Sequence, residues 1–452
     1  MTVHLRSKVA GVGRALLALT ACAAASLCPG AARADDPPPS VLYSIPAFAQ
    51  AADFKKSLAD LGLTLQSIYI GETLANPSGG ARQGAIYEGR LEFLLYADMD
   101  KIAGWPGATL HAHGYWLQGT GLSRYYVQNF LAVSNIEALP SVRLYELWLE
   151  QKLDDDKLAL RFGLLGADSE FAIGRYTLLF VNATVGWPDI LGHDMPSGGP
   201  AVPLSALGFR ARYDFNDNFA LLAAIFDGDP AGPGPGDPQR RDPYGLNFRL
   251  RDPPLLMQEA QFNYNQGKSA AGLPGTIKIG AWEYFGNVAN YRADPLGIQY
   301  NLTGLQPVSL LGDYGAYAMI DQLVLGTEDD PTRGVGVFAR VFGAPSERNM
   351  LDFYCDGGVN VSGLVPGRPK DAFGLSFAYD NISAAIRDAA KAASLPVIPD
   401  HEILLELTYQ AQILPGWTAQ PVAEYVVHPA AGTGGFNLPN AVVIGLRTTL
   451  NF

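Results

Sequence analysis

The sequence predicts an all-β protein, a 16-stranded antiparallel transmembrane β-barrel with long extracellular loops and short periplasmic turns. Three observations lead to this prediction. Segments of about ten residues alternate between apolar and polar side chains, which is the pattern of a strand with two different faces. After residue 34, no run approaches the roughly 18 apolar residues that a transmembrane helix needs. The segments between the strands alternate between short turns and long loops.

The composition excludes several other classes of protein. With 48% hydrophobic residues the chain is too apolar to be disordered, and three cysteines are too few for a disulfide scaffold. A formal charge of −12 argues against a nucleic-acid binder, which needs a basic surface to neutralise phosphates. Only 17% of the residues are charged, against ~25% in typical soluble domains, and this leaves a membrane protein open.

The first 34 residues have the features of a secretory signal peptide. A basic start at 6–14 precedes an apolar stretch at 15–27, and Ala32-Arg33-Ala34 is a small-x-small cleavage signal. Residues 19–22 also fit a lipoprotein signal, although the later cleavage site is the cleaner match. Removal of residues 1–34 leaves Cys355 alone, so no internal disulfide is expected. Residues 35–60 are interpreted as an N-terminal periplasmic segment, Pro-rich and then weakly helical, and residues 61–452 as the barrel.

Two segments show the alternation clearly. From 87 to 95 the odd positions are apolar, and Glu88, Arg90 and Glu92 lie between them. From 442 to 452 the even positions are mostly apolar, and Arg447 falls on the other face. An Arg or Lys that faces lipid at mid-bilayer costs roughly 2–4 kcal/mol, so the wall of a barrel requires this segregation. A water-soluble β-sandwich alternates in the same way, and alternation alone does not separate the two folds.

Loop lengths favour the barrel. Short turns follow the even-numbered strands, while the connections after odd-numbered strands are mostly long, with 343–349 as an exception. Such an asymmetry between the two rims is typical of outer-membrane barrels. The strands are expected to begin near Leu61, Tyr87, Ala108, Val142, Leu158, Ala206, Phe219, Leu255, Gly275, Tyr314, Gly334, Met350, Asp371, Glu402, Thr418 and Ala441.

The polar face of the strands is expected to line an aqueous passage, because sixteen strands enclose more space than side chains fill. Ionised side chains offer hydrogen bonds to hydroxyl groups, and aromatic rings offer an apolar plate for a sugar. Acidic residues are at least as frequent as basic ones on this face, whereas an anion pore needs an excess of Lys and Arg. We therefore expect a neutral polyhydroxylated solute; the alternative is a hydrated wall without solute preference. The predicted pore-lining residues are Glu88, Arg90, Glu92, Glu146, Trp148, Glu150, Arg161, Arg210, Arg212, Arg340 and Arg447.

The connection 166–205 is the longest and carries Phe171, Tyr176, Phe180 and Trp187. A loop so rich in aromatic residues is poorly suited to free solution. We expect it to fold into the pore and to form a constriction.

Other candidate sites are weaker. His111 and His113 lie on one face of a strand, as a pair of metal ligands does, but no third ligand is near in the sequence, so polar wall residues are the simpler interpretation. Asp227-Gly-Asp229 lacks the spacing of a full calcium loop and is interpreted as a turn. After residue 34 the chain has no nucleophile elbow, phosphate-binding glycine loop or zinc-protease motif. No metal, cofactor or catalytic residue is therefore predicted.

A series of short motifs follows one order along nearly the whole chain from Leu61 to Phe452. They occupy 71–72, 76–80, 87–98, 105–107, 143–151, 161–163, 168–171, 206–210, 315–322, 336–340, 347–349, 357–358, 366–368 and 445–447. In this order they resemble the carbohydrate-selective OprB porin family. The resemblance implies a barrel that admits glucose and related sugars by passive diffusion, narrowed by an inward loop. Glu146, Trp148, Arg161 and Arg210 lie inside matching motifs and are carried over as neck residues.

The resemblance also implies partners and a location. We expect carbohydrate solutes, outer-membrane lipid and lipopolysaccharide as partners, in the outer membrane of a Gram-negative bacterium, with both a monomer and a homotrimer left open. Two alternatives are kept. One is a general diffusion porin without sugar preference. The other is a secreted β-rich carbohydrate-active enzyme that uses a pair of carboxylates.

Overall fold

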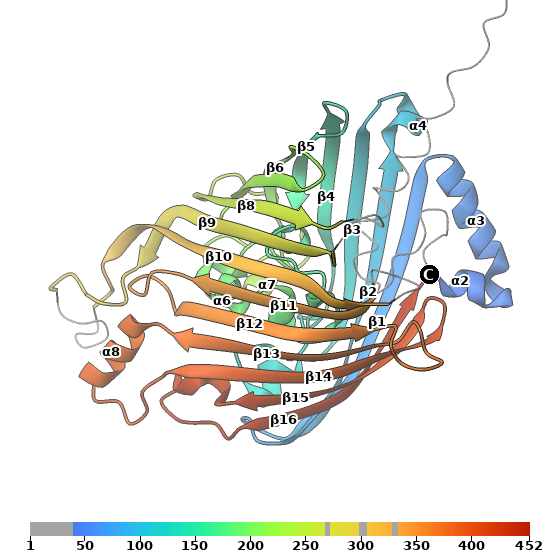
Figure 1. The fold of residues 1–452 in the computed structure, drawn as a ribbon. Coiled ribbons are helices and arrows are strands. Elements are labelled where there is room, and N and C mark those ends of the chain that lie inside the picture. Colours follow the sequence, from blue (N-terminus) through green and yellow to red (C-terminus); the bar gives the residue numbers. More distant parts are fainter. Residues whose placement is uncertain (1–38, 267–271, 298–304, 328–332) are drawn as a thin grey trace, which may run out of the picture.

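The computed structural model describes residues 39–266, 272–297, 305–327 and 333–452, and the predicted signal peptide lies outside these ranges. Its strands close into one antiparallel barrel in which each strand pairs with its neighbours in sequence (Figure 1). The strands are β1 (Leu63–Ser78), β2 (Gly84–Asp98), β3 (Ala108–Gly119), β4 (Ser141–Leu153), β5 (Leu158–Leu165), β6 (Ala206–Asp214), β7 (Phe219–Asp227), β8 (Pro254–Tyr264), β9 (Gly275–Ala289), β10 (Ser309–Gly326), β11 (Gly334–Gly343), β12 (Leu351–Ser362), β13 (Ala372–Ile382), β14 (His401–Leu414), β15 (Trp417–Val427) and β16 (Ala441–Asn451).

The first and last strands close the barrel. β1 pairs with β16, with Glu72 opposite Arg447, and pairs with β2 on its other side. Each strand of the described chain therefore has two hydrogen-bonded neighbours, and closure removes the unpaired edge that an open sheet would expose. The predicted 16-stranded barrel is confirmed. β10 differs most from its prediction, since it begins at Ser309 rather than near Tyr314.

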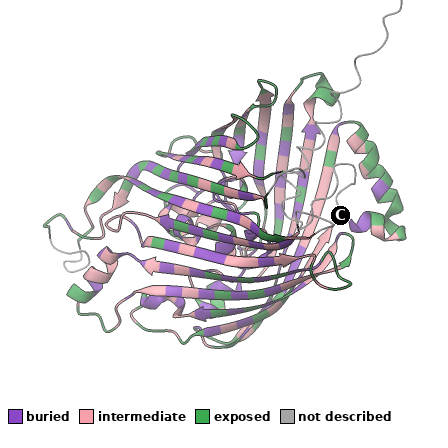
Figure 2. Cartoon of the chain, viewed as in Figure 1, coloured by how far each residue is buried: buried purple, intermediate pink, exposed green. Residues whose placement is uncertain are grey.

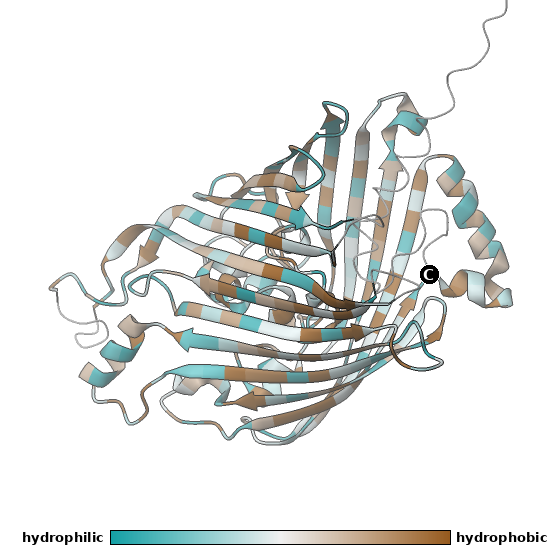
Figure 3. Cartoon of the chain, viewed as in Figure 1, coloured by the Kyte–Doolittle hydropathy of each residue, from teal (hydrophilic) through white to brown (hydrophobic). Residues whose placement is uncertain are grey.

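The two faces of the wall differ as the alternation predicts. Phe93 and Leu446 point outward and are 53% and 51% exposed, whereas Glu92 and Arg447 point inward and are 2% and 7% exposed. Figure 2 shows buried and exposed bands that alternate along the strands, and Figure 3 shows brown, hydrophobic bands interspersed with teal, hydrophilic ones along the same strands. One departure lies on β9, where Glu283 is exposed on the outer face.

Short helices precede the barrel: α2 (Val41–Ser44), η2 (Pro46–Phe48) and α3 (Ala49–Asp60). They lie beside the rim at which the chain ends (Figure 1). The Ser44 hydroxyl donates to the carbonyl of Pro415 in the β14–β15 turn at 2.7 Å, and Lys55 Nζ donates to the carbonyl of Phe452 at 2.6 Å. These bonds dock the segment on the rim of short turns. Among the described residues, no helix is both long and apolar enough to cross a bilayer.

Connections of different length lie at the two rims. Short turns at 154–157, 215–218 and 415–416 follow even-numbered strands, and α4 (Met99–Ala103) lies in the β2–β3 turn. The long connections hold η3 (Ser123–Val127), α7 (Pro238–Arg241), α8 (Ala384–Ala392) and η7 (Pro429–Gly432), and the longest holds η4 (Ala167–Ser169), η5 (Thr177–Leu179), α5 (Ala183–Gly186), α6 (Asp189–Asp194) and η6 (Pro196–Gly198). The β1–β2 connection, residues 79–83, is short although it follows an odd-numbered strand.

Candidate functional site

The longest loop, residues 166–205, folds back into the barrel. Phe171 and Trp187 pack in a cluster with inward-facing aromatic side chains of β9, β10 and β12. Tyr176 and Phe180 are buried with Phe338 of β11. In Figure 1, α6 of this loop is visible behind β11 and β12. The predicted inward loop is confirmed, because its aromatic residues cover the inner wall rather than the outer rim.

Carboxylates of the wall hold the loop by its backbone amides. Glu259 of β8 accepts a hydrogen bond from the N–H of Ala172 at 2.8 Å. Glu406 of β14 accepts from the N–H groups of Val181 and Asn182 at 2.8 and 3.0 Å. Hydrogen bonds to an ionised acceptor are stronger than neutral ones. The loop is therefore fixed at two well-separated places on the ring of strands, and it crosses part of the interior between them.

Arg340 of β11 holds the same loop by its carbonyl groups. Its guanidinium donates to the carbonyl oxygens of Ala172 and of residues 184–186 at 2.8–3.1 Å, and it pairs with Asp356 of β12. The Arg340 side chain has no exposed surface. Arg340 is predicted from the sequence to line the pore; in the structure it contacts the loop and Asp356, because the loop covers this part of the wall.

Two arginines and two glutamates form a cluster between the wall and the start of the loop. Arg161 of β5 pairs with Glu150 of β4 at 2.9 Å and with Glu170 of the loop at 3.0 Å, and Arg210 of β6 reaches the same two carboxylates at 2.7 and 2.6 Å. Burial alone would raise the pKa of Glu170, but the two arginines outweigh this effect and lower it to about 2. The side chains of Glu150 and Glu170 stay 13% and 18% exposed. The cluster thus presents donors and acceptors together with balanced formal charge.

Trp148 of β4 lies in a row of rings that crosses neighbouring strands. Tyr96 of β2 lies 4.2 Å from His111 of β3, and His111 lies 4.6 Å from Trp148, between ring centroids. On the β5 side, Arg161 Cζ lies 3.8 Å from the centre of the Trp148 ring. Trp148 is 6% exposed. The indole therefore supports the Arg161 guanidinium through a cation–π contact, and little of its surface is free for a solute.

Arg90 and Glu92 of β2 and Arg447 of β16 form a second inward group. Arg90 pairs with Glu92 at 2.8 Å, and Arg447 pairs with Glu72 of β1. Both arginines also bind Asn135 in the β3–β4 connection: Arg447 donates to its side chain at 2.7 Å and Arg90 to its carbonyl at 3.2 Å. The sequence did not predict the contacts of Arg447 with Glu72 and Asn135, because these residues lie more than 300 positions away from it in the chain.

Glu88 and Arg212 lie beside these two groups: Glu88 is opposite Glu72 in the β1–β2 register, and Arg212 is two residues from Arg210 on β6. Glu88 of β2 is 2% exposed, and one of its carboxylate oxygens is buried without a hydrogen-bond partner. Arg212 of β6 pairs with Asp214 at 2.7 Å and keeps 32% of its side chain exposed. The eleven predicted residues therefore do not form one site. Glu150, Arg161 and Arg210 belong to the first cluster with Trp148 beside it, and Arg90, Glu92 and Arg447 belong to the second group. Arg340 anchors the loop, Glu146 lies beside His111 and His113, and Glu88 and Arg212 make up the rest.

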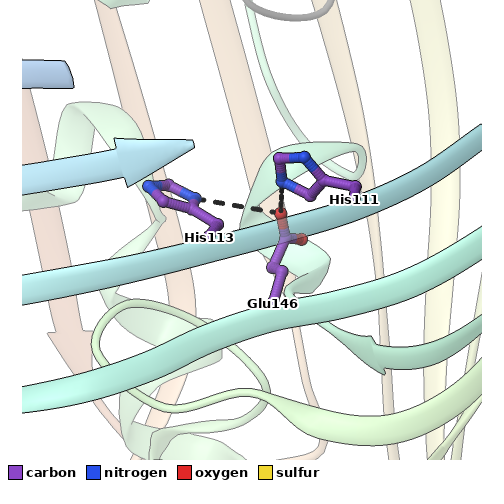
Figure 4. Close-up of side chains that lie close together, drawn as sticks. All are labelled: His111, His113 and Glu146. Carbon is purple, nitrogen blue, oxygen red and sulfur yellow. Dashed lines mark ion pairs between the residues drawn. The ribbon is translucent and has the colours of Figure 1, made fainter. Parts of the chain in front are cut away.

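A β-bulge in β4 turns two consecutive residues inward. The β3–β4 register shifts just after His113, so that Tyr145 and Glu146 are both buried. Arg143 faces inward as well, at 3% exposure, although the alternation of 143–151 did not predict this. The bulge also brings Glu146 next to His111 and His113, and so supplies the third potential metal ligand that the sequence did not reveal (Figure 4).

Two cavities of about 320 and 330 Å³ open between the long loops. Arg124 of η3 and Val202 line both of them. The first is also lined by Trp187 of the inward loop, and the second by Asn135, which binds Arg90 and Arg447. The inward loop 166–205 and the β3–β4 connection therefore both line the space on the long-loop side.

A closed antiparallel barrel with an apolar outer face, an ionised inner face and a loop folded inside it defines an outer-membrane channel of the porin type. The family model "Carbohydrate-selective porin, OprB family" matches residues 82–452. The chain belongs to this family. Porin B of Pseudomonas aeruginosa is 22% identical over 417 residues, which cover 87% of this chain and 88% of that protein.

Solved structures agree on the fold. The high-pH structure of OprB from Pseudomonas putida superimposes with a TM-score of 0.78 at 23% identity, over 89% of this chain and 97% of that one. The outer-membrane channel DcaP of Acinetobacter baumannii gives a TM-score of 0.52 at 11% identity, over 86% of this chain and 97% of that one. The family consists of channels rather than enzymes, and its Gram-negative members imply an outer-membrane location.

Proposed function

We propose that the barrel admits glucose and related neutral sugars by passive diffusion, through a polar passage that the loop 166–205 narrows. The observation that supports this most is the balanced cluster of Arg161, Arg210, Glu150 and Glu170. A sugar hydroxyl is both a donor and an acceptor, so it can bond to an arginine and to a glutamate in the same cluster. Because the formal charges cancel, the cluster offers no excess charge to attract a small anion or cation.

The predicted pore-lining residues then divide into two roles. We assign solute contact to Glu150, Arg161 and Arg212, whose side chains keep accessible surface. Trp148 and Arg210 would position this cluster, since both are nearly buried against it. The other predicted residues would act by holding the inward segments; these are Glu88, Arg90, Glu92, Glu146, Arg340 and Arg447.

Planar bilayers test the proposal. We expect glucose and maltose to reduce the ion current of the reconstituted protein in a saturable way, and succinate to leave it unchanged. Arg161→Gln should weaken the sugar effect severalfold, whereas Arg240→Gln, at an exposed loop position, should not. Absence of any sugar effect in the wild type would instead indicate a general diffusion porin.

Two finer points complete the proposal. Cleavage after Ala34 would give a mature chain that begins with Asp35, and intact-mass spectrometry of the exported protein measures this directly.

The mature protein would contact lipid and lipopolysaccharide through the wall and the long-loop rim, as a monomer or a homotrimer. Mass measurement of detergent-solubilised complexes distinguishes the two assemblies.

A further inference from the structure

Two imidazoles and a carboxylate converge on the inner face of β3 and β4. Figure 4 shows His111 and His113 directed at the Glu146 carboxylate. Glu146 Oε2 lies 3.6 Å from His111 Nε2 and 4.0 Å from His113 Nδ1, and the three potential ligand atoms lie within 4.8 Å of one another. All three residues are at least nine-tenths buried.

Each imidazole is fixed by the nitrogen that points away from Glu146. His111 Nδ1 lies 3.0 Å from the carbonyl oxygen of Leu95, and a carbonyl can only accept, so this nitrogen carries the proton. His113 Nε2 lies 3.1 Å from the Glu92 carboxylate and donates to it. In the neutral rings, His111 Nε2 and His113 Nδ1 therefore keep free lone pairs. Metal-binding histidines are held in this way, with the outer nitrogen bonded to a carbonyl or a carboxylate.

The carboxylate is oriented in the same manner. Glu146 Oε1 accepts from the N–H of Gly166 at 3.1 Å and from the hydroxyl of Ser169 at 3.2 Å. These bonds leave Oε2 directed at the two imidazoles. All three donor groups are thus oriented by bonds on their far sides, a feature that a chance cluster of polar residues does not require.

We propose that His111, His113 and Glu146 bind a divalent transition-metal ion such as Zn²⁺, through His111 Nε2, His113 Nδ1 and Glu146 Oε2. Two histidines and a glutamate are an established zinc ligand set that leaves the fourth position to water. Ligand atoms around a tetrahedral zinc lie about 3.4 Å apart, given metal–ligand distances near 2.1 Å. The two carboxylate–imidazole gaps of 3.6 and 4.0 Å need to shrink by less than 1 Å to reach this geometry, and the gap between the two imidazole nitrogens, which is at most 4.8 Å, by less than about 1.5 Å.

The site has a consequence for the channel. Glu146 joins β4 to Gly166 and Ser169 at the start of the inward loop, and the histidines belong to β3. A bound ion would therefore tie two strands and the base of the loop together. Any ligand that binds only the folded state also stabilises it by mass action.

The test is a Zn²⁺ titration of the mature, detergent-solubilised protein after treatment with a chelator, followed by calorimetry at pH 7.5. We expect one tight equivalent in the wild type. His111→Ala and His113→Ala should each weaken this binding tenfold or more. His428→Ala is the matched control, because His428 contacts Asp400 at 2.8 Å in a separate cluster near the loops, and it should leave the tight equivalent intact.

Two further measurements keep the proposal falsifiable if the alanine variants fold poorly. Glu92→Gln retains all three ligands but loses the charge that holds His113, and should weaken Zn²⁺ binding about 10- to 100-fold. Crystals soaked in ZnCl₂ should give an anomalous peak between His111, His113 and Glu146. Absence of a tight equivalent in the wild type, or a peak only at His428, would overturn the proposal.

Discussion

Arg340 of β11 and Asp356 of β12 form an ion pair in which neither side chain is exposed, with Arg340 Nε 2.9 Å from Asp356 Oδ1. Tyr354 also donates to the same carboxylate at 2.7 Å. The remaining guanidinium N–H groups are used by loop carbonyls. A buried charge is stable only when its partners satisfy it in this way. The pair therefore links the inner wall to the loop that narrows the passage.

Replacement of Arg340 should release the loop. Arg340→Ala leaves the Asp356 carboxylate buried and unpaired, which costs roughly 3–5 kcal/mol when a buried pair is broken. We expect a lower thermal stability and a larger, noisier single-channel current. Arg240→Ala is the control, since that residue is exposed in the β7–β8 connection, and it should change the current little. An unchanged current in Arg340→Ala would show that the loop does not depend on this anchor.

The outward face of β16 gives a test of orientation. Leu446 is 51% exposed on the apolar outer surface. Leu446→Arg would place a charge in lipid at a cost of roughly 2–4 kcal/mol near mid-bilayer. The fraction of protein with the heat-modifiable mobility of a folded barrel should fall, while Leu446→Ile should assemble normally. Equal amounts of folded Leu446→Arg and wild type would refute the assignment of faces.

Trp148 should influence sugar binding through Arg161. Trp148→Ala removes the ring that lies 3.8 Å from the Arg161 guanidinium, a contact worth about 0.5–2 kcal/mol. We expect the barrel to fold and sugar-induced blockade to weaken. Trp148→Phe keeps an aromatic face for the guanidinium and should retain most of the effect. A sugar titration that is the same in all three proteins would show that Trp148 does not influence sugar binding.

The pairing of Glu170 with two arginines predicts how the current through the channel depends on pH. The folded pKa of Glu170 is lowered to about 2, since the two arginines outweigh burial, while an unperturbed Glu titrates near 4.3. Its contribution to stability is therefore complete above the unfolded pKa and is lost as the pH falls through the folded pKa. The part of the pH dependence of the single-channel current that Glu170→Gln removes should therefore lie below pH 4. A transition near pH 4.5 that Glu170→Gln abolishes would contradict the paired arrangement.

The strands could be predicted because alternation is a local property. β10 began earlier than predicted because a register shift lies between Leu311 and Asp313, around Gly312 with φ +78°. Such a bulge interrupts the period of two. The bulge in β4 had the same effect on Arg143 and Tyr145, which both face inward although the alternation places them on the outer face.

The contacts of the site could be predicted only in part. The inward orientation of Arg161, Arg210 and Glu150 follows from alternation. Their shared partner Glu170 does not, because it belongs to a loop whose path depends on the whole barrel. The same holds for Arg340, whose loop partners are more than 150 residues away in the chain.

Liposome swelling measures passage itself and tests sugar selectivity most directly. Proteoliposomes that contain the wild-type channel should swell faster in isosmotic glucose than in succinate, although succinate is the smaller solute. Replacement of both Arg161 and Arg210 by Gln should reduce this difference. Swelling rates that follow solute size alone, with succinate faster than glucose, would contradict a sugar-preferring channel.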